Sequence, residues 1–217
     1  MTSLRNVAWM ALATFVPFSQ ALAQGEPEVR FISVGSLDWT AENLSVRVFR
    51  NGDPIPEVGG ATAWAEAGGA GLPATSTYEN RLTVPDAWGR LYNYAALVDP
   101  RGLCPAGWRI PDDADWRDLE AALGSDRAGL RLRARSGWPS GGEGSDDVSF
   151  GGLPAGFRTQ RGEYFLGGRV AYFWSSTPAS PTETTAHMLF DYSPKIFRIK
   201  YSKAMGMSVR CVRKRAP

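Results

Sequence analysis

The chain has 217 residues, of which 43% are hydrophobic and 21% are charged, a balance typical of one soluble globular domain and unlike that of disordered or fibrous proteins. The net charge of +2 is too small to steer the protein toward nucleic acid or an anionic membrane, so we expect neither as a partner. Eight Trp, seven Tyr and ten Phe beside 24 Gly and 15 Pro predict a loop-rich fold held by large rings.

Residues 1–23 have the pattern of a secretory signal peptide. Arg5 supplies the positive charge, residues 7–18 the apolar stretch, and Ala21-Leu22-Ala23 the small-residue cleavage site. The alternative is a membrane anchor, but this apolar run is too short to cross a bilayer and Pro17 interrupts it. Cleavage would leave 23 basic against 22 acidic side chains and no lipid-acceptor Cys after the site. We therefore expect a periplasmic or extracellular protein without a membrane span.

The first part of the expected mature chain is poor in regular structure. Residues 24–30 are predicted to form a polar linker, and alternating apolar residues predict strands at 29–34 and 44–50. Residues 56–85 are rich in Gly, Ala, Thr and Pro with little periodicity, which predicts a long ordered loop held in part by Trp64.

The clearest predicted helix begins after Asp112, a good N-cap, and ends at Gly124. Its apolar residues from Trp116 to Leu123 recur at helical spacing, and a second helical turn is predicted at 128–133. Further short strands are predicted at residues 150–153, 156–159, 162–165, 170–175, 185–190, 195–201 and 207–212. Strands at both ends, one good helix between them and long loops predict an α+β domain.

The two cysteines, Cys104 and Cys211, are expected to form a disulfide, because export places the chain in an oxidising compartment. A bridge across 107 residues would stabilise the fold by roughly 4–5 kcal/mol in the chain-entropy model. The alternative is a pair of buried free thiols.

Eight motifs in a fixed order together resemble the Fibrobacter succinogenes major paralogous domain, a family of bacterial exported and surface proteins. The motifs are Trp39-Thr40-Ala41-Glu42-Asn43-Leu44, Gly52-Asp53-Pro54-Ile55-Pro56, Gly89-Arg90-Leu91-Tyr92-Asn93-Tyr94, Gly102-Leu103-Cys104-Pro105-Ala106-Gly107-Trp108-Arg109-Ile110-Pro111, Asp115-Trp116, Leu153-Pro154-Ala155-Gly156-Phe157-Arg158, Phe173-Trp174-Ser175-Ser176-Thr177 and Ser208-Val209-Arg210-Cys211-Val212.

The resemblance covers residues 31–213 and leaves 214–217 as a basic tail. It implies a fold similar to the C-type lectin and formylglycine-generating enzyme group, with looped-out segments, antiparallel strands and chain ends close together. Members are mostly surface proteins without an assigned ligand. The basic residues Arg210, Arg213, Lys214 and Arg215 are interpreted as a solvated chain end.

Catalysis is not expected. His187 is the one histidine, and the chain has neither a Gly-x-Ser-x-Gly elbow nor a His-Glu-x-x-His motif. The formylglycine-generating enzymes need a reactive cysteine pair, whereas the two cysteines here match the expected structural bridge. The acidic loop with Glu143, Asp146 and Asp147 lacks the alternation of a calcium loop and suits a solvated turn. We therefore expect no metal and no cofactor.

The tryptophans divide into two groups. Trp39, Trp108, Trp116 and Trp174 lie in motifs flanked by apolar or turn residues, and we assign them to the core. Trp64 and Trp138 lie in glycine-rich segments, where they would either stack against a sugar ring or hold loops against the core.

A ligand surface is predicted in the late strands, where charged and tyrosine residues alternate with apolar ones: His187, Asp191, Tyr192, Lys195, Arg198, Tyr201 and Lys203. The alternative is an ordinary outward strand face. The main hypothesis is a recognition module for a protein or a glycan, with a passive structural envelope protein as the alternative and an enzyme third. A contiguous exposed patch around Tyr192, Arg198 and Tyr201 would favour recognition, whereas scattered or buried side chains would favour the structural alternative.

Overall fold

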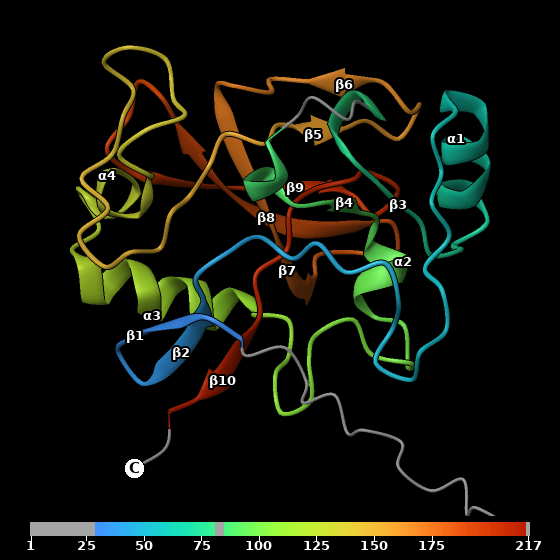
Figure 1. Ribbon diagram of the computed structural model, residues 1–217, viewed down its shortest axis with the longest axis horizontal. Coiled ribbons are helices and arrows are strands. Elements are labelled where there is room, and N and C mark those ends of the chain that lie inside the picture. The colour runs from blue at the N-terminus through green and yellow to red at the C-terminus, as the bar shows by residue number, and fades with distance from the viewer. Residues whose placement is uncertain (1–28, 81–84, 216–217) are drawn as a thin grey trace, which may run out of the picture.

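The computed structural model describes residues 29–80 and 85–215, which form an α+β fold of small antiparallel sheets, short helices and long connections (Figure 1). The strands are β1 Phe31–Val34, β2 Leu37–Thr40, β3 Thr75–Ser76, β4 Leu91–Tyr92, β5 Phe157–Arg158, β6 Tyr164–Phe165, β7 Val170–Pro178, β8 Glu183–Phe190, β9 Ile196–Ser202 and β10 Val212–Lys214. The helices are α1 Ala61–Gly69, α2 Tyr94–Leu97, α3 Asp113–Leu123 and α4 Ala128–Leu132, with 3-10 turns at Tyr78–Asn80 and Asp86–Trp88. The predicted α+β class is confirmed.

The main sheet has the strand order β7-β8-β9, and all its pairs are antiparallel. One side of this sheet packs against α3 and α4. A second sheet, β1-β2-β10, joins the first and last elements of the described chain, with Val212 of β10 opposite Trp39 of β2. These early and late strands lie side by side in Figure 1.

Helix α3 forms where the sequence predicted it, because its first turn is capped by its own side chains. Asp112 accepts hydrogen bonds from the backbone of Asp115, whose carboxylate accepts from the Asp112 N–H in return. The helix buries Trp116, which meets Trp39 edge-on with ring centroids 4.8 Å apart. Gly124 follows the last turn with φ +79°, a conformation that glycine adopts without strain.

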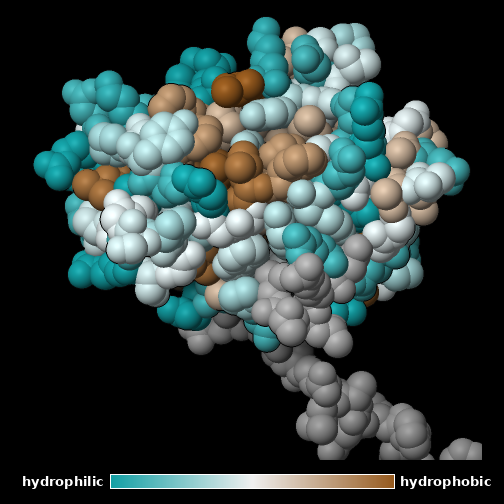
Figure 2. All heavy atoms as spheres, turned by 90° about the horizontal axis from the view of Figure 1, so that it is seen from above, coloured by the Kyte–Doolittle hydropathy of each residue, from teal (hydrophilic) through white to brown (hydrophobic). Residues whose placement is uncertain are grey.

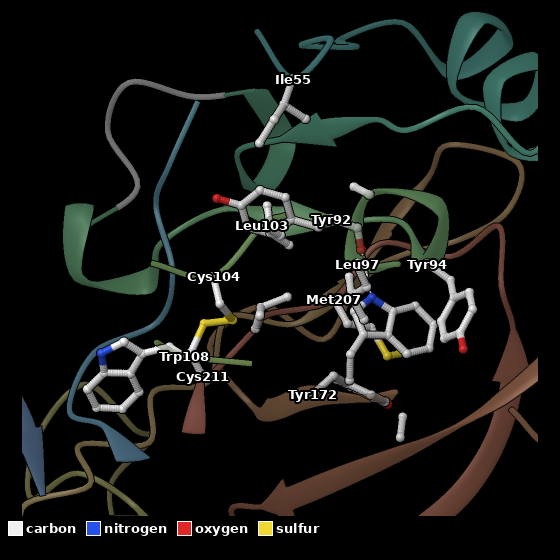
Figure 3. Close-up of a cluster of buried hydrophobic side chains, with 14 of the residues drawn as sticks. Ile55, Tyr92, Tyr94, Leu97, Leu103, Cys104, Trp108, Tyr172, Met207 and Cys211 are labelled. Atoms are coloured by element: carbon white, nitrogen blue, oxygen red, sulfur yellow. Dashed lines mark hydrogen bonds between the residues drawn. A yellow bond between two sulfur atoms is a disulfide. The ribbon is translucent and has the colours of Figure 1, made fainter. Parts of the chain in front are cut away.

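The disulfide joins Cys104, in the loop before α3, to Cys211, just before β10, with their Cα atoms 6.0 Å apart. It lies at the edge of a buried cluster that includes Tyr92, Leu103 and Met207, with Trp108 alongside (Figure 3). The predicted bridge is therefore present and fixes the C-terminal strand to the loop that precedes α3. The four tryptophans assigned to the core, Trp39, Trp108, Trp116 and Trp174, are all buried.

Two buried arginines hold irregular segments together. Arg210 donates to the backbone carbonyls of Thr40 and Phe150, both at 2.8 Å, and lies over the Phe150 ring. Arg158 donates to the carbonyls of Gly59 and Gly60. The interpretation of Arg210 as part of a solvated end is wrong. The guanidinium satisfies several loop carbonyls at once, and burial lowers its pKa to about 9, which leaves it charged at neutral pH.

The region predicted as one long loop contains α1, and that prediction is wrong. Alternating Ala residues favour a helix, and Trp64 anchors this one: its indole is buried and donates to the Ala204 carbonyl at 3.0 Å. The close fit needs a glycine opposite, since a Cβ on Gly206 would lie 2.7 Å from the Trp64 ring.

Three predicted strands are also wrong. Residues 44–50 contribute one bridge, from Val48 to Pro54, and residues 150–153 one bridge at Gly152, while only the end of 207–212 enters β10. Their apolar side chains reach the core from an irregular backbone, so alternation alone misleads there. Strand β2 was not predicted. The strands predicted at 156–159, 162–165, 170–175, 185–190 and 195–201 overlap β5 to β9.

Candidate functional site

The predicted ligand residues lie on β8, on β9 and in the turn between them, but on two different sides of the sheet. His187 pairs with Arg198, and both side chains point toward α3. Tyr201 pairs with Thr184 and points to the opposite side, where it packs against the cluster of Figure 3. Tyr192, in the turn, is 73% exposed. The structure therefore splits the predicted surface into two sets of residues.

On the α3 side, three side chains converge on Asp113. Nε2 of His187 lies 3.2 Å from Oδ1 of Asp113, and Arg198 donates to the same oxygen. Nη1 of Arg117 lies 3.8 Å from the other carboxylate oxygen. Burial lowers the pKa of His187 to about 4, against the opposing attraction of Asp113, so the ring is neutral near pH 7. The imidazole also stacks on Trp116, with centroids 4.8 Å apart.

A histidine beside a carboxylate is half of a familiar catalytic arrangement, but this one is closed. His187 is 2% exposed and Asp113 is 4% exposed. A general base has to come within hydrogen-bonding reach of a substrate proton, and this imidazole has almost no open surface at which that contact can form. We interpret the network as one that fastens β8 and β9 to α3.

On the other side of the sheet, exposed and half-buried apolar side chains follow one another in a line. We call this set the apolar arc; it comprises Phe157, Phe165, Phe190, Tyr192, Phe197, Ile199 and Tyr201. Phe190 contacts Tyr192 and Phe197 with ring centroids 5.1 and 5.0 Å apart. At the other end Phe157 contacts Phe165 at 6.0 Å and Tyr201 at 6.3 Å.

The most open members of the arc are Tyr192 at 73%, Phe165 at 47%, Ile199 at 46% and Phe197 at 36% exposure. The space-filling view looks down on the side where β5 and β6 lie in Figure 1. There, hydrophobic residues gather in a band across the middle, with hydrophilic residues around it (Figure 2). A contiguous apolar surface of this kind marks an interaction site more often than scattered single residues do.

The position of β9 in the sheet explains why the arc is exposed. Phe197 and Ile199 lie opposite Met188 and Ala186 of β8, and those two partners are fully buried. Strand β9 is the outermost strand, so the same face that is covered over β7 and β8 opens to solvent one strand further out. Burial in the interior therefore does not account for Phe197 and Ile199 of β9.

Leu166, next to Phe165 of the arc, adds a second unusual feature. It is 43% exposed and has a positive φ of +59°. A bulky residue seldom adopts this left-handed conformation, and such strain gathers at functional sites. The turn is held by the Leu166 carbonyl, which accepts from the N–H groups of Arg169 and Val170.

The polar residues predicted for the ligand surface mostly have local partners. Asp191 pairs with Arg169 at 3.1 Å, and Lys195 pairs with Asp126 at 2.8 Å. Lys203 donates to the carbonyls of Ser180 and Pro181 and lies over the Tyr94 ring. These contacts shape the surroundings of β9.

Trp64 and Trp138 have no open ring face. Trp64 is fully buried, and Trp138 is 7% exposed. Each indole N–H donates to a backbone carbonyl, that of Ala204 for Trp64 and that of Gly152 at 2.9 Å for Trp138. The Trp64 ring thus holds α1 against the interior and the Trp138 ring holds its loop there, close to the second of the two arrangements considered from the sequence.

Lys203 also lines two adjoining surface hollows of about 380 and about 520 Å³ that share Gly68 and Gly71. Their other walls include Pro73, Asn93, Thr182 and Ala204. The ammonium group of Lys203 already donates to two carbonyls, so it is not free to bind a small ligand in these hollows.

The carboxylates of the acidic loop bind backbone N–H groups of the same loop and one arginine. Glu143 accepts from the Gly141 N–H, Asp146 accepts from the Gly151 N–H, and Asp147 pairs with Arg131 at 3.2 Å. In residues 29–80 and 85–215 no group of three or more His, Cys, Asp or Glu side chains is placed to hold a metal ion.

Sequence reasoning did not single out Phe197, Ile199, Phe165 or Leu166, because it treated apolar strand residues as core. A signal was present: the segment Ile196–Ser202 alternates large apolar residues with Arg198 and Lys200. Basic residues on a short strand are typical of an edge, and at an edge the apolar face has no neighbouring strand to cover it.

Comparisons with known proteins agree with the motifs. The family model of the Fibrobacter succinogenes major domain matches residues 32–213. A search of the curated proteins and a search of the solved structures each found no match. In the part of the chain that the structure describes, no helix is long and apolar enough to cross a membrane.

Proposed function

The chain belongs to the Fibrobacter succinogenes major domain family, and from this premise we propose that it is an exported, non-catalytic recognition module that binds a protein partner through the apolar arc. One observation carries the proposal. Four large apolar side chains, Phe165, Tyr192, Phe197 and Ile199, are between 36% and 73% exposed within one continuous line. Leaving them in water costs stability that covering them would recover.

The chemistry of the arc favours a protein over a glycan. A sugar is bound by an open aromatic face together with several free hydrogen-bonding groups. Trp64 and Trp138 have no open face, while Asp191 and Lys195 beside the arc are already paired. Tyrosine and phenylalanine are enriched at protein interfaces, and tyrosine is among the side chains that contribute most to binding there.

Export rests on the signal pattern of residues 1–23, which lie outside the described residues. The Cys104–Cys211 bridge supports it, because such bonds persist mainly in oxidising compartments. If the proposal is right, the protein recovered from the periplasmic or extracellular fraction will begin at Gln24 by mass measurement. A mature protein that retains Met1 and stays in the cytoplasmic fraction would contradict it.

We also propose that the fold is the C-type-lectin-like arrangement expected from the resemblance. Pairing of the first and last strands of the described chain through β1-β2-β10, and long looped segments tied by one bridge, support this. An experimental structure superposed on a C-type lectin domain tests it. A different order of the paired strands would contradict it.

The binding function is tested with a photo-crosslinking residue in place of Phe197 in the full mature chain, exposed to an envelope extract of the source organism. The matched control carries the same residue at Val98, which is 52% exposed and follows α2. We expect an adduct with one protein from position 197 and none from 98. The purified partner should then bind the wild type at least tenfold more tightly than the double variant Phe197→Ser, Ile199→Ser.

Equal crosslinking from both positions, or equal affinity of the double variant and the wild type, would exclude the arc as the binding surface. The passive structural alternative would then be favoured. The control variant Val98→Ser should leave the affinity unchanged, because Val98 does not belong to the arc.

A further inference from the structure

The outer edge of β9 has a row of backbone groups without strand partners. Within the described chain β9 pairs with β8 alone. The Lys203 N–H donates to the Thr182 carbonyl at 2.9 Å, so these two residues form a hydrogen-bonded pair just beyond the end of the two strands. In an antiparallel ladder such pairs recur at every second residue. Residues 197, 199 and 201 therefore face β8 with their N–H and C=O groups, and Ile196, Arg198 and Lys200 direct theirs outward.

The two faces of this edge differ in chemistry. Phe197, Ile199 and Tyr201 are on the side of the apolar arc, whereas Arg198 and Lys200 are on the side of α3. Asp113 binds Arg198, and Lys200 has no ion-pair partner among the residues that the structure describes. A strand laid against β9 would thus meet apolar side chains on one face and cations on the other.

A second copy of the chain is a poor candidate for that strand. All four charged residues in the segment 195–203 are basic: Lys195, Arg198, Lys200 and Lys203. Antiparallel pairing of two β9 strands about Ile199 would set Arg198 against Lys200 and Lys195 against Lys203. Like charges directly opposite each other destabilise a strand pair, so the edge is protected from pairing with itself.

We propose that β9 binds its partner by strand addition, and that the added segment is an extended stretch of a protein in which apolar residues alternate with acidic ones. This inference rests on the proposed function and specifies its mode. Backbone hydrogen bonds to residues 196, 198 and 200 would supply affinity, while the arc and the two cations would select the sequence. The apolar residues of the segment would cover Phe197 and Ile199, and its acidic residues would face Arg198 and Lys200.

The test uses the full mature chain and three synthetic ten-residue peptides. The first alternates valine and glutamate, the second alternates valine and lysine, and the third is the first with every second backbone amide N-methylated along one edge. By calorimetry we expect the valine-glutamate peptide to bind at least tenfold more tightly than either of the others. In residue-resolved hydrogen exchange its binding should protect the amides of Arg198 and Lys200, with little change at Phe197 and Ile199.

A matched pair of variants isolates the backbone contribution. Lys200→Ala removes the cation and keeps the N–H, whereas Lys200→Pro removes both, and proline is tolerated where an edge N–H faces solvent. We expect the affinity for the valine-glutamate peptide to fall about threefold in Lys200→Ala and at least a further tenfold in Lys200→Pro. If Lys200→Pro fails to fold, the N-methylated peptide makes the same distinction with the wild type.

Strand addition is overturned if the N-methylated peptide binds as well as its parent, if the two charge patterns bind alike, or if the first peptide does not bind at millimolar concentration. Any of these results leaves the proposed function open to its own test, because crosslinking at position 197 does not depend on the peptides. A different pair of results would exclude the arc as the site. These are no crosslinked partner from position 197, and equal peptide affinity of the wild type and the double variant Phe197→Ser, Ile199→Ser.

Discussion

Backbone hydrogen-bonding groups have opposite surroundings in two regions of the molecule. One region is the set of loops around Arg158 and Arg210, and the other is the edge strand β9. Around the loops, each buried guanidinium donates to several backbone carbonyls, those of Gly59 and Gly60 for Arg158 and those of Thr40 and Phe150 for Arg210. On β9 the outward groups of residues 196, 198 and 200 have no strand partner within the described chain. The fold therefore satisfies carbonyls of these irregular segments with arginine side chains and leaves the outer edge of β9 open. Openness at a regular edge is what a strand-binding surface requires.

The largest effect is expected from Arg210→Ala, which removes the guanidinium that donates to the loop carbonyls. The buried carbonyls of Thr40 and Phe150 and the side-chain oxygen of Asn43 would all lose their donor. We expect the free energy of unfolding to fall by about 5 kcal/mol, measured by urea denaturation. The control is Arg30→Ala, because Arg30 forms an exposed pair with Glu42. Similar, small losses for both variants would mean that the buried guanidinium does not hold the loops.

Removing the disulfide tests the same region by a different route. The double variant Cys104→Ala, Cys211→Ala should lower the free energy of unfolding by about 4 kcal/mol, because the bridge closes a separation of 107 residues. Urea denaturation with and without reductant measures the loss, and reductant should affect the wild type alone. Alkylation of both cysteines in the exported wild type without reductant would contradict the bridge.

The pH dependence of stability examines the network that joins β9 to α3. The pKa of His187 is lowered by burial to about 4, from about 6.5 in the unfolded chain. Below pH 6.5 the unfolded state binds a proton that the folded state does not, so stability is complete above pH 6.5 and falls as the pH approaches 4. The loss should be of the order of 2–3 kcal/mol.

The comparison that isolates this effect is His187→Gln, whose stability should depend less on pH over the same window. Carboxyl groups whose pKa is lowered by arginine partners, such as Asp99 beside Arg101, titrate in both proteins and cancel in the difference. Parallel stability curves for wild type and variant between pH 7 and 4 would show that folding does not lower the pKa of His187.

The smallest effect is expected on β9 itself. Phe197→Ser should lower the free energy of unfolding by about 1 kcal/mol, because its ring is already partly in water. The matched variant Met188→Ser, directly opposite on β8 and fully buried, should cost about 3 kcal/mol or more. Equal losses in thermal or urea unfolding would show that Phe197 packs in the interior, and the apolar arc would lose one of its exposed members.

Much of the main sheet and of α3 was predictable from the sequence. Asp112 and Gly124 delimit α3 because capping chemistry is local. The segments of β7, β8 and β9 are long enough for strands and contain the aromatic and β-branched residues that favour them. The irregular segments were not predictable in the same way. The alternation at residues 44–50 predicts a strand, but no neighbouring strand lies in register with it.

The candidate site was only half predictable. The sequence drew attention to Tyr192, Arg198 and Tyr201 on the correct strand and turn, yet the pairing of His187 with Arg198 places that arginine on the opposite side from Tyr201. Exposure of Phe197 and Ile199 depends on which strand is outermost. Arg198 and Lys200 in the strand indicate an edge, but the strand order itself is a property of the assembled sheet.

By itself, the sequence determined the family, the α+β class, the cysteine pair and the capped helix, because each depends on residue identity at short spacing or on ordered motifs. Only the tertiary structure decided that Arg210 is interior while Phe197 and Ile199 are exterior, the reverse of what their polarity predicts. It also decided between the two arrangements considered for Trp64. The physical reason is that burial is set by neighbours distant in sequence. A charged guanidinium is stable inside when loop carbonyls surround it, and a phenylalanine stays outside when its strand is the last in the sheet.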